Sequence, residues 1–198
     1  MSEFIYGFDS SLTAFGYAVA EVEYFGARPR FLAAGVLTTK PTPKTGPVKL
    51  RPTKTADHQR RFEWLATELR AVIAQHGKPS IVAVEAVALP FGKTGIVTVS
   101  ALGRARGLVD GLAAEHGLSA REFHSKTLKK LMTGNPGADK PAVIAAVKGL
   151  YPELHELLGQ LNAANVEHAA DAVAALHAAL TKEHHDAEEN DEAPEFEE

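Results

Sequence analysis

The sequence predicts an α/β fold in which a mixed sheet carries helices on its faces. Strand-like and helix-like segments follow one another in the order βββαβαβαα, which favours this class. The chain has 198 residues, 45% of them hydrophobic, enough for one domain with a core. It has no cysteine, which excludes disulfides, a thiol nucleophile and a zinc-thiolate site. No apolar run is long enough to cross a membrane and no signal peptide is recognisable, so we expect no membrane partner.

The first elements are predicted strands. Residues 4–9 and 14–23 are rich in Tyr, Phe and Val and flank the polar turn 10–13, which is typical of a β-hairpin. A third strand over 30–38 would complete an antiparallel meander. Residues 40–55 contain four prolines and five basic residues. Because proline blocks helix and removes backbone donors, we predict a long basic loop there, which is either a solvated linker or a contact for phosphates.

Helices and further strands alternate in the rest of the chain. Apolar residues at helical spacing predict a helix over 57–76. The apolar run 80–84 ends in Glu85 and is typical of a strand buried on both faces. The remaining predicted elements are a helix over 97–116, a strand over 119–123, and helices near 125–132, 139–150 and 166–181.

Charge is unevenly distributed along the chain. The formal net charge is −4, but nine of the 25 acidic residues lie in 183–198, which contain no Lys or Arg. Residues 1–182 keep 21 basic and 16 acidic groups, a balance of +5. We therefore predict a basic domain over 1–182. Residues 183–198 are predicted to be an acidic, disordered tail, which is either a solvating segment or a competitor with a polyanionic partner for the basic face.

Acidic and imidazole side chains stand where apolar residues are expected. Asp9 and Glu85 each end a predicted strand, while His168 and Asp171 lie three apart on one helix face. If the two strands are neighbours, their ends meet where ligands gather in α/β sheets. Clustered carboxylates repel one another, and a divalent cation such as Mg²⁺ or Mn²⁺ relieves that repulsion. Each residue alone also fits an ordinary turn or helix-surface role, so spacing leaves both interpretations open.

Five short motifs lie within residues 4–180. In chain order they are Gly7-Phe8-Asp9 with Gly16-Tyr17-Ala18-Val19, Val82-Ala83-Val84-Glu85, Ala101-Leu102-Gly103-Arg104-Ala105-Arg106-Gly107, Lys129 with the loop Thr133-Gly134-Asn135-Pro136-Gly137-Ala138-Asp139-Lys140, and His168-Ala169-Ala170-Asp171-Ala172. Together they resemble the motifs of RuvC-type Holliday junction resolvases of the RNase H-like superfamily. The last resembles the family's DAADA pattern with His in place of the first Asp, and Ser10-Ser11 stand where the family usually has Pro-Gly. The resemblance implies a five-stranded mixed sheet, with an antiparallel meander and two parallel strands.

The resemblance implies two-metal-ion catalysis. The family's four metal-binding positions carry over onto Asp9, Glu85, His168 and Asp171, with two Mg²⁺ ions per site, about 3.5–4 Å apart, and Mn²⁺ as a substitute. One ion would generate hydroxide, and the other would stabilise the departing 3′ oxygen. Asp9 would be shared by both ions, Glu85 would hold one, and His168 with Asp171 the other. The products would carry a 5′-phosphate and a 3′-hydroxyl.

The resemblance also implies which residues contact DNA. Lys129 and Lys140 match basic positions that contact the backbone near the cut. Gly134 and Gly137 would let their loop approach DNA closely. Arg104 and Arg106, in the third motif, are either phosphate contacts or ordinary helix-surface charges.

An aromatic that stacks on a junction base in the family is replaced here by Ala88. Phe91 or its neighbour Lys93 could substitute, and stacking of Phe91 would contribute about 1–3 kcal/mol per base. The alternative is that Phe91 packs in the protein's own core.

These features predict a metal-dependent endonuclease that resolves four-way DNA junctions by paired symmetric nicks, with DNA binding that weakens steeply with salt. The expected partners are branched DNA and a second copy of this chain, with 97–116 as the interface helix, and a branch-migration motor could be a third. The expected location is the cytoplasm of a bacterial or phage-infected cell. The alternatives are a less selective branched-DNA or flap nuclease, a ribonuclease H-like enzyme, and a catalytically silent junction-binding protein.

Overall fold

The chain forms a five-stranded mixed sheet, as the sequence predicts. The computed structural model describes residues 2–24, 27–43, 53–87 and 95–191, with the backbone alone from 182 onward. The strands have the spatial order β3-β2-β1-β4-β5. The first three form the antiparallel meander, while β4 pairs in parallel with β1, and β5 with β4. The strand bounds are Glu3–Asp9 (β1), Ala14–Val22 (β2), Arg30–Thr38 (β3), Ile81–Glu85 (β4) and Arg121–Phe123 (β5).

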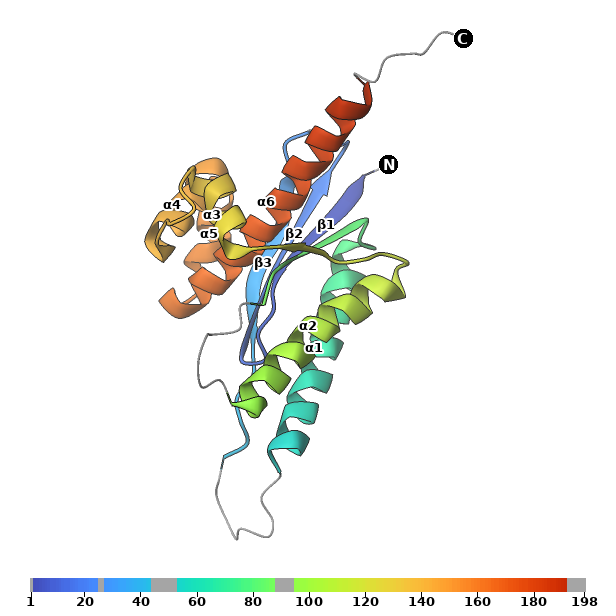
Figure 1. Cartoon of the computed structure of the whole chain (residues 1–198), viewed down its shortest axis with the longest axis vertical. Coiled ribbons are helices and arrows are strands. Elements are labelled where there is room, and N and C mark those ends of the chain that lie inside the picture. The colour runs from blue at the N-terminus through green and yellow to red at the C-terminus, as the bar shows by residue number, and fades with distance from the viewer. Residues whose placement is uncertain (1, 25–26, 44–52, 88–94, 192–198) are drawn as a thin grey trace.

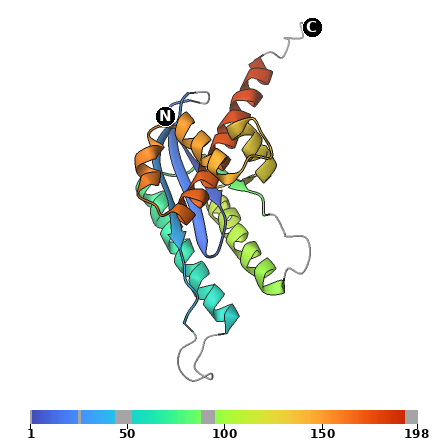
Figure 2. The ribbon, with the colours of Figure 1, turned by 90° about the vertical axis from the view of Figure 1, so that its left-hand side faces the viewer.

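Helices cover both faces of this sheet. Figures 1 and 2 show α1 and α2 together on one side, whereas α6 crosses the other side with α3, α4 and α5 beside it. The helix bounds are Lys54–His76 (α1), Ile96–Glu115 (α2), Ser125–Thr133 (α3), Lys140–Leu150 (α4), Leu154–Gly159 (α5) and Ala163–Asp191 (α6).

Local signals in the sequence set where several helices begin and end. The Thr53 side chain accepts a hydrogen bond from the backbone of Ala56 at the start of α1, and Asp139 caps α4 in the same way. The helix α3 ends at Gly134, whose φ of 75° is a left-handed conformation that favours glycine. Gly134 and the Asp139 cap thus fix the two ends of the loop between α3 and α4.

Each face of the sheet has its own hydrophobic core. The core beneath α1 and α2 contains Tyr6, Phe8 and Phe15 from the first two strands. The core beneath α6 contains large residues such as Phe31 and Tyr151, but α6 itself contributes mostly alanines to it, among them Ala169 and Ala172. Because alanine side chains are short, α6 lies close to the sheet.

Two predictions from the sequence need correction. The short helix α5 was not predicted: its six residues provide only one buried pair, Leu154 and Leu158, which is too little periodicity to recognise. The last helix was predicted over 166–181, but the α6 backbone extends from Ala163 to Asp191. Residues 182–191 contain neither Gly nor Pro, so nothing in them ends a helix. Residues 192–198 lie outside the described part of the chain.

None of the helices in the described residues is both long and apolar enough to cross a membrane.

Candidate active site

The ends of the two central strands bring the first two predicted site residues together. Strands β1 and β4 pair in parallel, with Phe8 opposite Val84. The next residue on each strand is Asp9 and Glu85, respectively. Because both strands point the same way, the two carboxylates emerge at the same edge of the sheet. Burial raises the pKa of Glu85, and the charge of the nearby Asp9 raises it further.

The helix α6 brings the other two residues to this edge by lying very close to the strands. A Cβ on Gly16 would lie 2.1 Å from the backbone oxygen of His168, and one on Gly7 would lie 2.1 Å from that of Ala172. Only glycine leaves room for this contact between helix and strand backbones. The close approach fixes His168 and Asp171 beside Asp9.

A direct hydrogen bond joins the strand end to the helix. Nδ1 of His168 lies 2.5 Å from Oδ2 of Asp9, and the two side chains are 32% and 18% exposed. An ionised carboxylate can only accept a hydrogen bond, so Nδ1 donates and Nε2 is the ring nitrogen left for another group. This hydrogen bond with Asp9 raises the pKa of His168 against the opposing effect of burial.

The cluster carries a concentrated negative charge. Burial, followed by the charges of Glu85, Asp9 and Glu167, raises the pKa of Asp171 to about 8. Burial and the charge of Asp9 likewise raise the pKa of Glu85. Both carboxylates resist ionisation because like charges lie close together at this edge of the sheet.

Two lysines flank the cluster from different helices. Lys129 and Ser125 lie one turn apart on α3 and both act on Glu85. Burial and the charge of Asp9 raise the pKa of Glu85, and a hydrogen bond with Ser125 and the charge of Lys129 partly oppose that rise. Lys140, the first residue of α4, forms an ion pair with Glu167 of α6. Both lysines singled out from the sequence therefore lie next to the acids.

A buried arginine holds the turn that follows Asp9. Arg61 of α1 donates hydrogen bonds to the Leu12 carbonyl and to the hydroxyls of Thr13 and Thr39, at 3.1, 2.8 and 2.7 Å. Its guanidinium also lies 3.7 Å from Asp57, one helical turn earlier. These contacts fix the turn without the Pro-Gly pair expected from the resemblance.

The other predicted DNA-binding residues have different environments. Arg106 forms ion pairs with Asp110 and Glu122, and its side chain is only 17% exposed. These contacts favour an ordinary helix charge over a phosphate contact. Arg104 donates a hydrogen bond to Gln59 and lines a cavity of about 210 Å³ with Lys54 and His58.

Gly134 and Gly137 lie in the α3–α4 loop, near Lys140. This loop is ordered by its own hydrogen bonds, including one from the Gly137 amide to the Asn135 side chain. A Cβ on Gly134 would meet no atom within 4 Å, so the surface there is open. Phe91 and Lys93 lie outside the described residues.

The donor set suits a divalent cation, although the side chains are not arranged around one. Three carboxylates and an imidazole are ligands that Mg²⁺ and Mn²⁺ accept, and a cation would relieve the repulsion that raises the pKa of Asp171. Within the described part of the chain, no three such groups already have the geometry of a metal site. His168 and Asp9 are instead hydrogen-bonded to each other.

Sequence reasoning missed three residues of this site: Ser125, Glu167 and Arg61. Glu167 directly precedes His168 and could have been noticed as one more acid beside the last motif. Ser125 and Arg61 carry no comparable signal, because ordinary helix residues acquire their roles here only through tertiary contacts.

A mixed sheet with acidic residues at the ends of its central strands defines the class of RNase H-like nucleases. A family model described as crossover junction endodeoxyribonuclease RuvC matches residues 5–181. The chain belongs to this family, whose members are divalent-metal-dependent nucleases.

Individual relatives agree with this family. The chain is 34% identical over 181 residues to crossover junction endodeoxyribonuclease RuvC of Zymomonas mobilis, covering 91% of this chain and 90% of the relative. The corresponding enzyme of Rickettsia bellii is 32% identical over 148 residues, or 75% and 82% of the two chains.

Solved structures share the fold. Thermus thermophilus RuvC superposes with a TM-score of 0.64 at 26% identity, covering 91% of this chain and 95% of that one. The same protein in complex with Holliday junction substrate gives a TM-score of 0.66 at 22% identity, covering 93% and 96%.

Proposed function

We propose that this chain resolves four-way DNA junctions by metal-dependent phosphodiester hydrolysis, cutting two opposed strands at symmetric positions. The observation that carries this proposal is the convergence of Asp9, Glu85, His168 and Asp171 at one sheet edge, in a chain of the RuvC family. The proposed products are a 5′-phosphate and a 3′-hydroxyl.

The four clustered residues are the proposed ligands of two Mg²⁺ ions, with Mn²⁺ as a substitute. Bound ions would activate water and stabilise the negative charge that develops at the scissile phosphate. Asp9 holds His168 through Nδ1, which fixes the ring and leaves Nε2 to bind. Glu85, held by Ser125, and the half-buried Asp171 of α6 supply the oxygen ligands.

The lysines beside the acids would bind the phosphates on either side of the cut. An ammonium is a compact point charge that suits a phosphate oxygen. Lys129 approaches the cluster from α3 and Lys140 from α4, so the two charges flank the acids. Arg104, with Lys54 and His58, lines a further basic cavity and is proposed as a more distant backbone contact.

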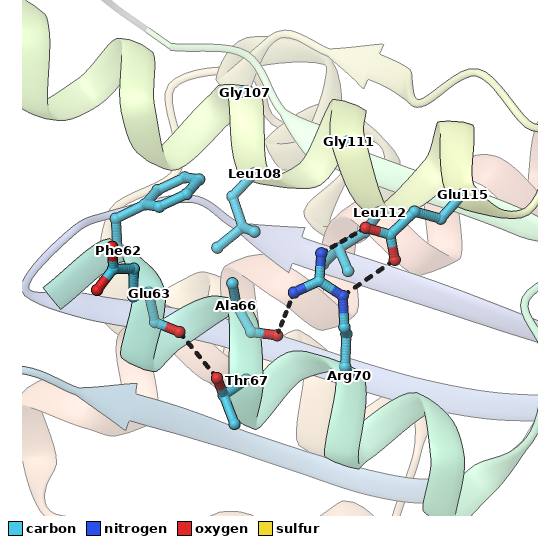
Figure 3. Close-up of a pocket in the computed structure, with 10 residues that line it drawn as sticks. All are labelled: Phe62, Glu63, Ala66, Thr67, Arg70, Gly107, Leu108, Gly111, Leu112 and Glu115. Carbon is cyan, nitrogen blue, oxygen red and sulfur yellow. Dashed lines mark hydrogen bonds and ion pairs between the residues drawn. The ribbon is translucent and has the colours of Figure 1, made fainter. Parts of the chain in front are cut away.

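A two-fold dimer would present two such sites to two opposed strands, which explains symmetric cutting. A hollow of about 350 Å³ between α1 and α2 includes Gly107, Gly111 and Phe62, and Arg70 reaches across it to Glu115 (Figure 3). The same two helices also expose large apolar side chains, namely Trp64, Ile96, Val97 and Val99. Exposed apolar surface of this kind favours contact with a second copy.

Sedimentation tests the dimer. The chain should sediment as a dimer, and Ile96→Asp, which places a charge on a side chain that is 84% exposed, should shift it toward monomer. A monomeric wild-type protein at micromolar concentration would contradict the proposal.

A panel of labelled substrates tests the activity. The chain should cut four-way junctions in Mg²⁺ or Mn²⁺ and leave linear duplex intact, and a metal chelator should stop cleavage. Cutting of three-way or flap substrates would instead indicate a general branched-DNA nuclease, and cutting of RNA–DNA hybrid a ribonuclease H-like enzyme. Junction binding without any cleavage would indicate a silent binding protein. The proposed location is the cytoplasm of a bacterial or phage-infected cell, which is supported by the bacterial origin of the RuvC relatives.

A further inference from the structure

Glu167 is an acid at the active site that the proposed metal set does not include. It lies directly before His168 on α6, and its side chain is 26% exposed. Its charge raises the pKa of Glu85, His168 and Asp171, in each case after larger effects of burial or hydrogen bonding. Glu167 therefore faces the cluster, although the four proposed ligands already account for the metal site.

The partner of Glu167 is Lys140. The carboxylate forms an ion pair with the Lys140 ammonium, which connects the starts of α6 and α4. The hydrogen bond with Glu167, and then the charges of Glu167, Asp171 and Asp9, raise the pKa of Lys140. The ammonium is thus held beside the acids, while 68% of its side chain remains exposed to an incoming ligand.

We propose that Glu167 is a positioning residue that occupies Lys140 in the DNA-free enzyme and gives it up to a backbone phosphate when the junction binds. This proposal rests on the proposed function, since it requires DNA at this edge. Carboxylate and phosphate oxygens compete for the same ammonium donors, so one oxygen anion replaces another. Lys140 stays next to the acids before and after the exchange.

The exchange has a consequence for affinity. The Lys140–Glu167 pair must break when DNA binds. The free energy of that pair is therefore subtracted from the free energy of DNA binding. Exposed ion pairs of this kind correspond to a factor of about two to five in a binding constant. Removing the Glu167 charge should therefore tighten DNA binding by about two- to fivefold, and this gain should act through Lys140.

Binding of a labelled four-way junction in EDTA tests this through a double-mutant cycle. Glu167→Gln should bind about two- to fivefold more tightly than wild type, and Lys140→Gln should bind more weakly. The loss caused by Lys140→Gln should be larger in the Glu167→Gln background than in wild type. Glu167→Asp, which keeps the charge on a shorter side chain, should lie between wild type and Glu167→Gln.

A matched control separates this exchange from a general charge effect. Glu153→Gln removes one negative charge from another exposed pair, that with Arg28, outside the cluster. It should produce no tightening that depends on Lys140. In Mg²⁺, Glu167→Gln should lower the KM for the junction when Lys140 is present and leave it unchanged in the Lys140→Gln background, which a merely structural pair would not produce.

Three outcomes would overturn the inference. Equal tightening by Glu167→Gln with and without Lys140 would indicate a general charge effect. Unchanged or weaker binding, with a lower melting temperature, would indicate a purely structural pair. If the wild-type chain bound no junction, both the proposed function and the exchange would fail. If wild type bound the junction but the effects of the Glu167 and Lys140 substitutions simply added, the exchange alone would be overturned.

Discussion

His168 and Asp9, 159 positions apart in the chain, are joined by a hydrogen bond of 2.5 Å between Nδ1 and Oδ2. The bond connects the start of α6 to the end of β1, the two elements that hold most of the acidic cluster. It also explains how an imidazole fits a position where the DAADA pattern has an acid. The Asp9 carboxylate orients the ring, as carboxylates orient histidines at many metal sites.

His168→Asp tests whether this residue acts as a ligand. The change restores an oxygen ligand of the DAADA type but adds negative charge beside Asp9. We expect retained cleavage in Mg²⁺, because a carboxylate oxygen is a ligand that Mg²⁺ accepts and the cation offsets the added charge. His168→Ala removes the ligand altogether and should weaken metal-dependent cleavage by at least about tenfold more than His168→Asp. Equal and complete inactivity of both variants, with folding and junction binding intact, would argue against a simple ligand role.

The raised pKa of Asp171 predicts how the stability of the metal-free protein depends on pH. An aspartate in an unfolded chain has a pKa of about 3.9, whereas burial and neighbouring charges raise that of Asp171 to about 8 in the fold. Between these values the folded state binds more protons than the unfolded state. The contribution of Asp171 to the free energy of unfolding therefore falls as pH rises from about 4 to about 8.

Asp171→Asn isolates this contribution from those of other groups. Burial lowers the pKa of His177, so the contribution of His177 to the free energy of unfolding rises with pH below about pH 6.5, opposite to the trend for Asp171. Because Asn does not titrate, the variant should gain stability relative to wild type as pH rises from 5 to 8 in EDTA. Melting temperatures of both proteins across this range measure the gain. A difference that stays constant or shrinks toward pH 8 would contradict the assignment.

Gly16→Ala tests the close packing that positions His168. The new Cβ would lie 2.1 Å from the His168 carbonyl oxygen, so the helix or the strand must move. We expect a loss of about 1–3 kcal/mol in the free energy of unfolding, together with reduced cleavage. Denaturant unfolding and junction cleavage measure the two effects.

Gly149→Ala is the matched control for this change. A Cβ on Gly149, in α4, meets no atom within 4 Å. The substitution should stabilise the chain by up to about 1 kcal/mol, because alanine favours helix. If Gly16→Ala behaved like Gly149→Ala, the close contact would not be what positions His168.

Much of the fold could be predicted from the chain because its signals are local. Alternating apolar residues indicated β1 and β2, and the buried run before Glu85 indicated a parallel strand. The C-terminal part of α6, beyond residue 181, was not predicted. An acidic segment can be helical, and between residue 182 and Pro194 no Gly or Pro ends the helix. Composition is therefore a poor guide to where this helix ends.

The site was predictable only in part. Its four central residues stand out because charged groups interrupt apolar patterns, and a familiar motif order connects them. Arg61 and Ser125 have no such contrast, since their roles depend on which elements pack together. The Lys140–Glu167 pair likewise depends on how α4 and α6 meet, which no local pattern specifies.

The most direct measurement of the central claim compares wild type and Asp171→Asn on one four-way junction labelled on all strands. In Mg²⁺, the wild-type chain should nick two opposed strands at symmetric positions and leave ends that a DNA ligase reseals. Asp171→Asn should bind the same junction with similar affinity and leave every strand intact. Wild-type cuts without symmetry, or cleavage by Asp171→Asn at the wild-type rate, would contradict the account.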